Sequence, residues 1–391
     1  MSANIRVLHL LKTSVGASWA LRQTQQLVKL GVEVHLVLPA GPMVDKYKAA
    51  GVNVHVFDPS LCISRPWKNI ARIRKLRALV KEIDPDVIHS HFVATTLLMR
   101  FGLVGLDVPR IFHVPGPLHL EHKIFRWLDL TSGGKLDYWL ASCLWTQKKY
   151  LSCGIAEQKV GLAYYGVNAG DFTFKPGQND LKASLGMASS DFLIGMVAYF
   201  YAPKGYLGQT RGLKGHEDLI DAVGIVRKQF PKTKCVFVGG PWGATQGYFN
   251  QVKQYAENTV GDACVFLGTR QDVPELYPQF DLAVHPSHSE NVGGAVESMY
   301  AGIPTLTTNI GGFPDLVTDG ETGLLAEVKS PESLANKIMQ AIEQPELCEK
   351  LVQQGTIKVQ QVMNVEHNAK QVFEFYQQVL ADYQGKTVSL C

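Results

Sequence analysis

The sequence lacks the patterns of a membrane span, a disulfide framework or a secretory leader. Its 391 residues contain no apolar run close to the roughly 18 residues that cross a bilayer. Its seven cysteines include no Cys-x-x-Cys pair, which favours reduced and mostly buried thiols. The first residues show no basic region followed by an apolar core, so we expect no signal peptide. Together these absences favour a cytoplasmic protein.

A strong charge of one sign and a dinucleotide fingerprint are also missing. The net charge of +3 is too small to indicate a nucleic-acid partner. The loop after the first predicted strand contains Gly16 and Ala17 but no Gly-x-Gly-x-x-Gly, which argues against a nicotinamide-dependent oxidoreductase. A hydrophobic share of 46% is typical of a globular protein, and the length fits two domains of roughly 150 to 200 residues.

Two sets of alternating strands and helices predict two parallel, doubly wound sheets. A polar stretch at 166–190, rich in turn residues, predicts a linker, and we place the boundary near Gly170. The expected strands are 6–11, 34–38, 54–57, 87–90, 110–113 and 138–142 in the first half, and 193–198, 235–239, 264–267, 282–285 and 305–308 in the second.

The most informative stretch runs from 285 to 323 and places two carboxylates around a glycine pair. An apolar strand precedes it, and a helix is expected over 292–301. Gly293 and Gly294 would let backbone N–H groups at the helix start approach a phosphate or sugar oxygen. Glu290 lies before that helix and Glu297 about one turn inside it, and a carboxylate can accept hydrogen bonds from two hydroxyls of a sugar.

With the turns at 309–315 and 319–323 and the string Lys-Gly-His-Glu at 214–217, the sequence resembles the family 4 retaining glycosyltransferases, also called glycosyl transferases group 1. The resemblance implies the GT-B architecture, in which two Rossmann-like α/β domains face each other across a cleft. Residues 1–170, with a returning C-terminal helix at about 366–391, would form the acceptor-side domain, and 171–365 would bind a nucleotide sugar. One departure is that Glu290 and Glu297 are seven positions apart, where the family usually has eight.

The resemblance also implies roles for individual residues. Lys214 would hold the donor diphosphate together with Arg211, for which Lys204 is the alternative. Glu297 would hold the ribose, and Glu290 with the two glycine amides the donor sugar. His119 is the first choice for the family's active-site histidine, with His113 as the alternative. Further residues expected to border the donor are Gly16, Ala17, Gly240 and Arg270.

Histidines are concentrated in one part of the first half. Five of the twelve occur in a single window, at His89, His91, His113, His119 and His122. No acidic residue flanks them at the spacing of a familiar zinc motif, so we expect no metal site. We also expect no cofactor, because cations and a helix start would already stabilise the diphosphate.

A basic amphipathic segment at 65–81 has two interpretations. Its apolar residues are spaced for one helix face, so the favoured interpretation is a solvated surface over a buried stripe. The alternative is docking on an anionic membrane surface, which would place the protein on the inner face of the membrane.

The sequence therefore predicts a retaining hexosyltransferase. It would move a sugar from a nucleotide-diphosphate sugar to a glycan or lipid-linked acceptor, in the synthesis of surface polysaccharide or another glycoconjugate. The alternatives are a nucleotide-sugar epimerase of the same fold, which would turn over the donor without an acceptor, and a non-catalytic carbohydrate-binding relative, which would bind the donor without releasing nucleotide.

Overall fold

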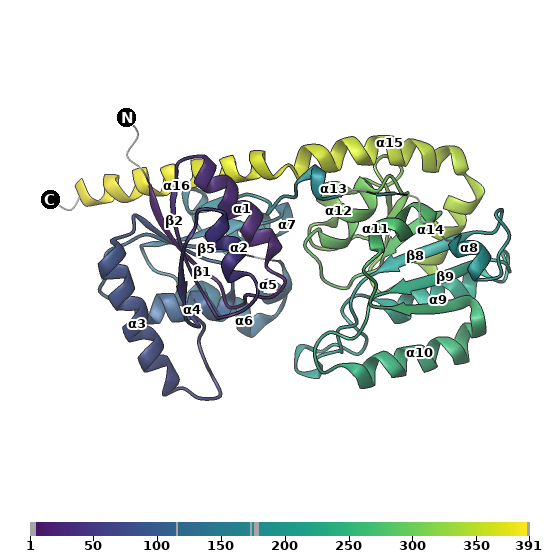
Figure 1. Cartoon of the computed structure of the whole chain (residues 1–391), viewed down its shortest axis with the longest axis horizontal. Coiled ribbons are helices and arrows are strands. Elements are labelled where there is room, and N and C mark those ends of the chain that lie inside the picture. Colours follow the sequence, from purple (N-terminus) through teal and green to yellow (C-terminus); the bar gives the residue numbers. More distant parts are fainter. Residues whose placement is uncertain (1–4, 115, 173, 176–179, 389–391) are drawn as a thin grey trace. The chain divides into compact units, whose positions relative to one another are not determined.

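The chain folds into two compact α/β units (Figure 1). A computed structural model describes residues 5–114, 116–172, 174–175 and 180–388. Unit 1 combines the chain up to Asn168 with the segment from Met363 onward, and unit 2 is Ala169–Val362. Residues 173 and 176–179 of the predicted linker, and residues 389–391 of the predicted C-terminal helix segment, lie outside the described residues.

Unit 1 contains a seven-stranded parallel sheet in the order β3-β2-β1-β4-β5-β6-β7. The central strands are buried on both faces, as expected for a parallel sheet covered by helices, and they carry buried histidines among their apolar residues. Its strands are β1 (Arg6–Leu10), β2 (Glu33–Leu38), β3 (Asn53–Val56), β4 (Val87–Ser90), β5 (Arg110–His113), β6 (Asp137–Ala141) and β7 (Val160–Leu162).

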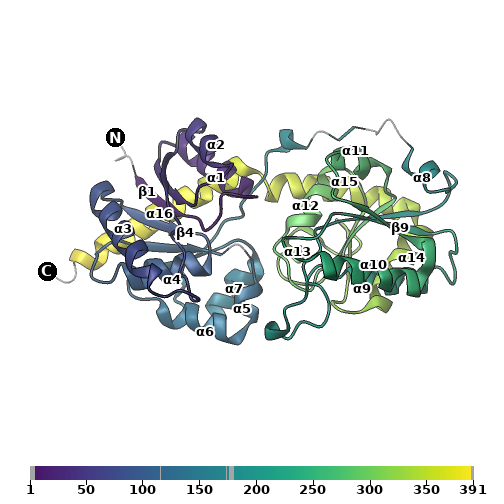
Figure 2. The ribbon, with the colours of Figure 1, turned by 60° about the horizontal axis from the view of Figure 1, so that its bottom comes forward.

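Helices cover both faces of this sheet. Apolar side chains of α1, α2 and α16 pack on the face of Val7 and Leu11, and those of α3 and α4 pack on the face of Leu8 and Leu10. Figure 1 shows α16 along the top of unit 1 and α3 and α4 below its strands, and in Figure 2 α3 and α4 lie in front of α16. The helices are α1 (Ser18–Lys29), α2 (Val44–Ala49), α3 (Lys68–Ile83), α4 (Val93–Gly102), α5 (Leu118–Glu121), α6 (Lys123–Ser132), α7 (Leu144–Ser152) and α16 (Val365–Val388).

Unit 2 repeats the plan with a six-stranded parallel sheet in the order β10-β9-β8-β11-β12-β13. Helices α9, α10 and α14 pack on one face, and α8 and α11 on the other. The strands are β8 (Leu193–Val197), β9 (Lys234–Val238), β10 (Cys264–Gly268), β11 (Leu282–His285), β12 (Thr305–Thr308) and β13 (Leu324–Ala326). The helices are α8 (Leu181–Ser184), α9 (His216–Val226), α10 (Gln246–Val260), α11 (Val273–Leu276), α12 (Gly293–Tyr300), α13 (Phe313–Leu316), α14 (Pro331–Glu343) and α15 (Pro345–Val362).

The predicted fold class is confirmed, and each predicted strand is present within one residue of its expected bounds. Sequence analysis missed the two three-residue edge strands, β7 and β13, which are too short to give a pattern of their own. Within the described ranges, no helix has the length and apolarity needed to cross a bilayer.

The C-terminal helix α16 belongs to unit 1 because its apolar stripe completes that core. Val372, Phe375, Tyr376 and Val379 recur at helical spacing and are buried. Where the chain returns to unit 1, the Val167 N–H donates to the Met363 carbonyl at 2.7 Å.

Gly166 lies beside this return with φ +67°, and a Cβ added there would be 2.6 Å from Val365 Cα. Gly154 also has a positive φ, of +86°, but a Cβ there would meet nothing within 4 Å.

We expect Gly166→Ala to lower the free energy of unfolding more than Gly154→Ala does. Both substitutions carry the left-handed penalty of about 1–2 kcal/mol, and only the first adds a steric clash, worth about 1–3 kcal/mol more. Urea unfolding followed by circular dichroism measures the difference. Equal losses in the two variants would contradict the close packing of α16 against Gly166.

Candidate functional site

Two loops of unit 2 meet because strands β8 and β11 are parallel neighbours. Lys214 lies at the end of the loop from β8 to α9, and Glu290 lies in the loop from β11 to α12. Parallel strands bring their carboxyl ends to the same edge of a sheet. The Lys214 ammonium there donates a hydrogen bond to the Glu290 carboxylate, and the two side chains are 22% and 13% exposed.

Backbone contacts fix these loops against each other. Gly215 has φ +75°, and an added Cβ would lie 2.0 Å from the Pro286 carbonyl oxygen, so this position requires glycine. The His288 N–H donates to the Leu213 carbonyl at 2.8 Å. The position of Lys214 is therefore determined by the backbone on both sides.

Lys214 is a cation at neutral pH. Burial by itself would lower the pKa of its ammonium, but the neighbouring Glu290 carboxylate outweighs this effect, and the pKa is raised. A positive charge held in one place is what a developing diphosphate charge requires.

The start of α12 lies at the same edge of the sheet. It begins at Gly293 without a side-chain cap, so N–H groups of the first turn remain available to an anion. An added Cβ at Gly294 would lie 2.6 Å from His285 Nδ1, which explains a glycine in the second position. Glu297, one turn further along, accepts a hydrogen bond from the Tyr277 hydroxyl at 3.3 Å.

The Arg211 side chain contacts α9 rather than Glu290. Its guanidinium pairs with Asp218 at 2.5 Å and with Asp221 at 2.7 Å, both on α9. The second oxygen of Asp218 contacts the His288 ring. Burial tends to raise the pKa of Asp218, and the hydrogen bonds from His288 and Arg211 more than reverse this, so its pKa is lowered. Arg211 as a diphosphate ligand therefore stays a prediction.

Sequence analysis did not select Asp218 or His288. The available signal was that Asp218 continues the Lys-Gly-His-Glu string by one residue, at the start of a predicted helix. An acidic residue in a first helical turn is so common that nothing in the sequence distinguishes Asp218.

Gly240 and Arg270 follow β9 and β10 at the same edge of the unit 2 sheet. An added Cβ at Gly240 would lie 2.4 Å from Thr269 Oγ1. Arg270 is exposed and pairs with Asp272. Both stay predicted donor contacts.

In unit 1, Gly16 and Ala17 lie in the turn between β1 and α1. Gly16 is exposed with φ +66°, and Ala17 is buried, its carbonyl accepting a hydrogen bond from the Tyr47 hydroxyl at 3.0 Å. The backbone at Gly16 is therefore accessible, as its predicted role requires.

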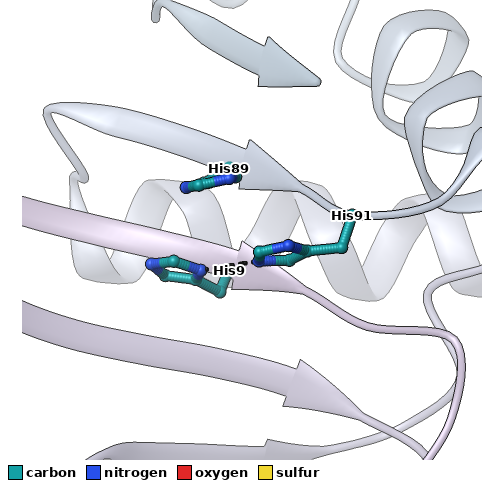
Figure 3. A group of neighbouring side chains, drawn as sticks. All are labelled: His9, His89 and His91. Carbon is teal, nitrogen blue, oxygen red and sulfur yellow. Dashed lines mark hydrogen bonds between the residues drawn. The ribbon is translucent and has the colours of Figure 1, made fainter. Parts of the chain in front are cut away.

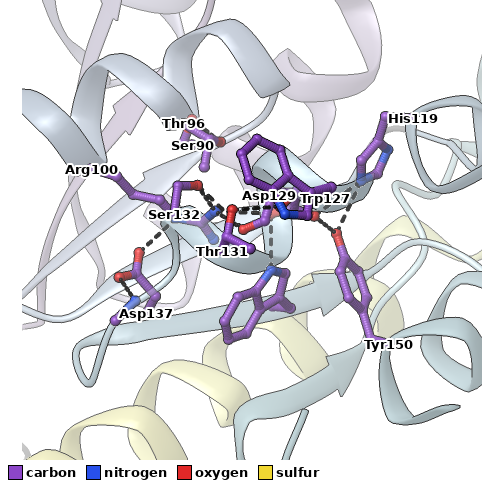
Figure 4. A network of polar contacts seen from close by, with 12 residues as sticks. Ser90, Thr96, Arg100, His119, Trp127, Asp129, Thr131, Ser132, Asp137 and Tyr150 are labelled. Atoms are coloured by element: carbon purple, nitrogen blue, oxygen red, sulfur yellow. Dashed lines mark hydrogen bonds and ion pairs between the residues drawn. The ribbon is translucent and has the colours of Figure 1, made fainter. Parts of the chain in front are cut away.

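His119 belongs to a buried polar network (Figure 4). Its Nε2 lies 3.1 Å from the Tyr150 hydroxyl and 3.3 Å from an Asp129 oxygen, and Asp129 also pairs with Arg100 at 2.9 Å. Burial raises the pKa of Asp129, but His119 and Arg100 together bring it to about 2. The network holds His119 in place, while its catalytic role stays a prediction.

The alternative histidine, His113, is fully buried and its Nε2 lies 3.0 Å from the Ala163 carbonyl. Its ring stacks near those of His89 and His91, and His9 of β1 joins them. Sequence analysis missed His9, which lies about 80 positions from the histidine-rich window.

Comparisons with known proteins agree with this architecture. The model of the group 1 glycosyl transferases matches residues 205–358, inside unit 2, and the model of glycosyltransferase family 4 matches residues 17–170, mostly in unit 1. The chain belongs to the family 4, or group 1, glycosyltransferases. It is therefore a transferase enzyme, and its two Rossmann-like units form the GT-B fold.

Relatives of this glycosyltransferase include two bacterial proteins. It is 24% identical to the capsular polysaccharide biosynthesis glycosyltransferase CapM of Staphylococcus aureus, over 98% of this chain and 100% of CapM. It is 23% identical to the UDP-Gal:alpha-D-GlcNAc-diphosphoundecaprenol alpha-1,3-galactosyltransferase of Escherichia coli, over 78% of each chain. The crystal structure of Anabaena HepE in complex with UDP-glucose has the same fold, with a TM-score of 0.75 at 20% identity and coverage of 99% and 100%.

Acid should destabilise unit 2 of this glycosyltransferase through buried histidines near Lys214. Burial, followed by the Lys214 charge, lowers the pKa of His216 and of His285 to about 3. Because the unfolded pKa is about 6.5, their stabilising effect is complete above pH 6.5 and is lost as the pH falls towards 3.

Each of the two histidines should reduce the free energy of unfolding by about 2 kcal/mol between pH 7 and pH 5. His216 stacks on Phe200 with ring centroids 3.8 Å apart, so His216→Phe should keep the packing. Between pH 7 and pH 5, the variant should lose about 2 kcal/mol less free energy of unfolding than wild type loses. Calorimetry at the two pH values measures this. An unchanged pH dependence in the variant would exclude His216 as a source of acid lability.

Proposed function

We propose that this glycosyltransferase moves a sugar from a nucleotide-diphosphate sugar to its acceptor with retention of configuration. The observation that carries the proposal is the contact between Lys214 and Glu290 at the edge of the sheet where α12 begins without a cap. A fixed cation, uncapped helix N–H groups and a carboxylate are the groups that a sugar diphosphate requires.

In this mechanism, charge grows on the diphosphate as the bond to the sugar breaks. Lys214 and the first N–H groups of α12 stabilise that charge. Glu290 accepts hydrogen bonds from the donor sugar, and Glu297 from the ribose hydroxyls. The leaving phosphate oxygen assists deprotonation of the acceptor on the same face, so transfer needs no separate protein base. Because these groups already supply the positive potential, we propose that transfer needs no metal ion or other cofactor.

The names of the relatives support the choice of substrates. HepE was crystallised with UDP-glucose, and the E. coli relative is named for UDP-Gal and a diphosphoundecaprenol acceptor. CapM is named for capsular polysaccharide biosynthesis. We therefore propose a UDP-sugar donor and a glycan or lipid-linked acceptor in surface polysaccharide synthesis.

A thermal-shift screen of UDP-, GDP- and ADP-sugars tests the donor site. We expect UDP-sugars to raise the melting temperature of wild type, since a ligand at 100 times its dissociation constant stabilises by about 2.7 kcal/mol. Glu297→Ala should abolish the shift, and Glu257→Ala, at an exposed position of α10, should retain it. A stable protein that responds to no nucleotide sugar would refute the proposed donor site. Turnover of donor without acceptor would indicate an epimerase instead.

The surface around α3 supports a peripheral membrane association. Arg65, Lys68, Arg74 and Lys75 are exposed, whereas Arg72 pairs with Asp58. Large apolar side chains are exposed just before α3 and in its first turn. Ile63 is 83% exposed, Trp67 65% and Ile70 56%. Exposed cations beside an exposed tryptophan fit the interface of an anionic bilayer. We therefore propose that unit 1 docks on the inner face of the membrane, where a lipid-linked acceptor would lie.

Changing Arg65, Lys68, Arg74 and Lys75 to Gln should weaken partitioning into phosphatidylglycerol vesicles by up to about 1,000-fold, at about 1 kcal/mol per cation. The matched control changes Lys228, Lys232, Lys253 and Lys350 of unit 2, which alters net charge equally. Co-sedimentation at physiological salt measures binding. Equal binding by both variants would refute docking through α3.

A further inference from the structure

Four histidines meet at the carboxyl edge of the unit 1 sheet. His9 on β1 is in register with His89 on the neighbouring β4. Side chains of a strand alternate between faces, so His91, two positions after His89, points to the same face. His113 ends the next strand, β5. All four side chains are completely buried.

Direct contacts organise these rings (Figure 3). The His9 and His89 rings stack with centroids 4.6 Å apart, and the His89 and His91 rings with centroids 4.4 Å apart. His9 Nδ1 lies 2.9 Å from His91 Nε2. Tyr376 of α16 contacts the cluster through its hydroxyl, 2.6 Å from His89 Nδ1 and 3.3 Å from His9 Nε2.

The hydrogen-bond directions assign the tautomers of the neutral rings. The Tyr165 hydroxyl donates to the His113 carbonyl at 3.2 Å, so it accepts from His91 Nδ1 at 3.1 Å. His91 Nε2 is then a lone pair that accepts from His9 Nδ1. His9 Nε2 in turn accepts from Tyr376, and the Tyr376 oxygen accepts from His89 Nδ1. Each of the three rings therefore presents an unprotonated Nε2.

This chain of hydrogen bonds leaves nitrogens without a partner. Among the described residues, His89 Nε2 is buried and makes no hydrogen bond, and the same holds for His113 Nδ1. A buried lone pair without a partner costs about 1–3 kcal/mol. A bound metal ion accepts such lone pairs and so supplies the partner that they lack.

We propose that His9, His89 and His91 form a binding site for one transition-metal ion of the Zn²⁺ class. One nitrogen from each ring lies within 4.8 Å of the others. Tetrahedral Zn²⁺ holds its nitrogen ligands about 3.3 Å apart. The rings are stacked, so metal binding requires them to rotate until their lone pairs converge, and it replaces the direct contact between His9 and His91. Three protein ligands leave a fourth position for a water molecule.

The ligand set selects the kind of metal. Imidazole nitrogens suit zinc, copper, nickel and iron, whereas Mg²⁺ and Ca²⁺ take oxygen ligands. Because the ligands come from β1, from β4 and from the residue after β4, the ion would cross-link two central strands of unit 1. The site is in unit 1 and Lys214 with Glu290 is in unit 2, so this proposal does not depend on the proposed function.

The test uses full-length protein without a histidine tag, produced in zinc-supplemented medium and passed through gel filtration with EDTA. Elemental analysis should find about one metal ion per wild-type chain. The paired change His89→Gln with His91→Gln should reduce this at least tenfold. The control is His35→Gln with His55→Gln, which removes the other close histidine pair of unit 1, 3.1 Å apart, and should keep the metal.

Refolding wild type with Co²⁺ gives a second readout that does not require a variant to fold. We expect the visible absorption of four-coordinate Co²⁺ at one equivalent, and its loss on addition of excess Zn²⁺. The proposal is overturned by wild type that holds no metal and shows no such absorption. Metal that is retained by the His89/His91 variant and lost by the His35/His55 variant would overturn it equally.

Discussion

Parallel pairing of strands is the constraint on which every site described above depends. In unit 2, the pairing of β8 with β11 brings Lys214 and Glu290 into contact although 76 positions separate them. In unit 1, the pairing of β1 with β4 stacks His9 on His89. Both groups of residues lie at the carboxyl edge of a parallel sheet, where the loops of a doubly wound fold place functional groups.

Glycine allows the loops at those edges to approach each other closely. At Gly215 and Gly294 a Cβ would collide with Pro286 and His285. These close approaches hold Lys214 near the start of α12, so its charge is in place before the proposed donor binds. Such preorganisation lets a charged group stabilise a transition state without reorganising at the moment of reaction.

The sequence predicted the two sheets and their central strands, because apolar runs are local signals. It could not predict that Arg211 pairs with Asp218 and Asp221, since the direction of a guanidinium depends on the packing of α9. It also could not place His9 in the histidine cluster, because strand order determines which residues become neighbours. The buried network of His119 depends on α6 and β6 in the same way.

The most direct test of the central claim compares dissociation constants for the nucleoside diphosphate and for its sugar, measured by calorimetry on Lys214→Met and Glu290→Gln. If Lys214 holds the diphosphate, Lys214→Met should weaken both ligands by a similar factor. If Glu290 holds the sugar, Glu290→Gln should weaken only the nucleotide sugar and leave the diphosphate bound as well as in wild type, or better, because Lys214 is released. Equal weakening of both ligands by Glu290→Gln would contradict the division of roles.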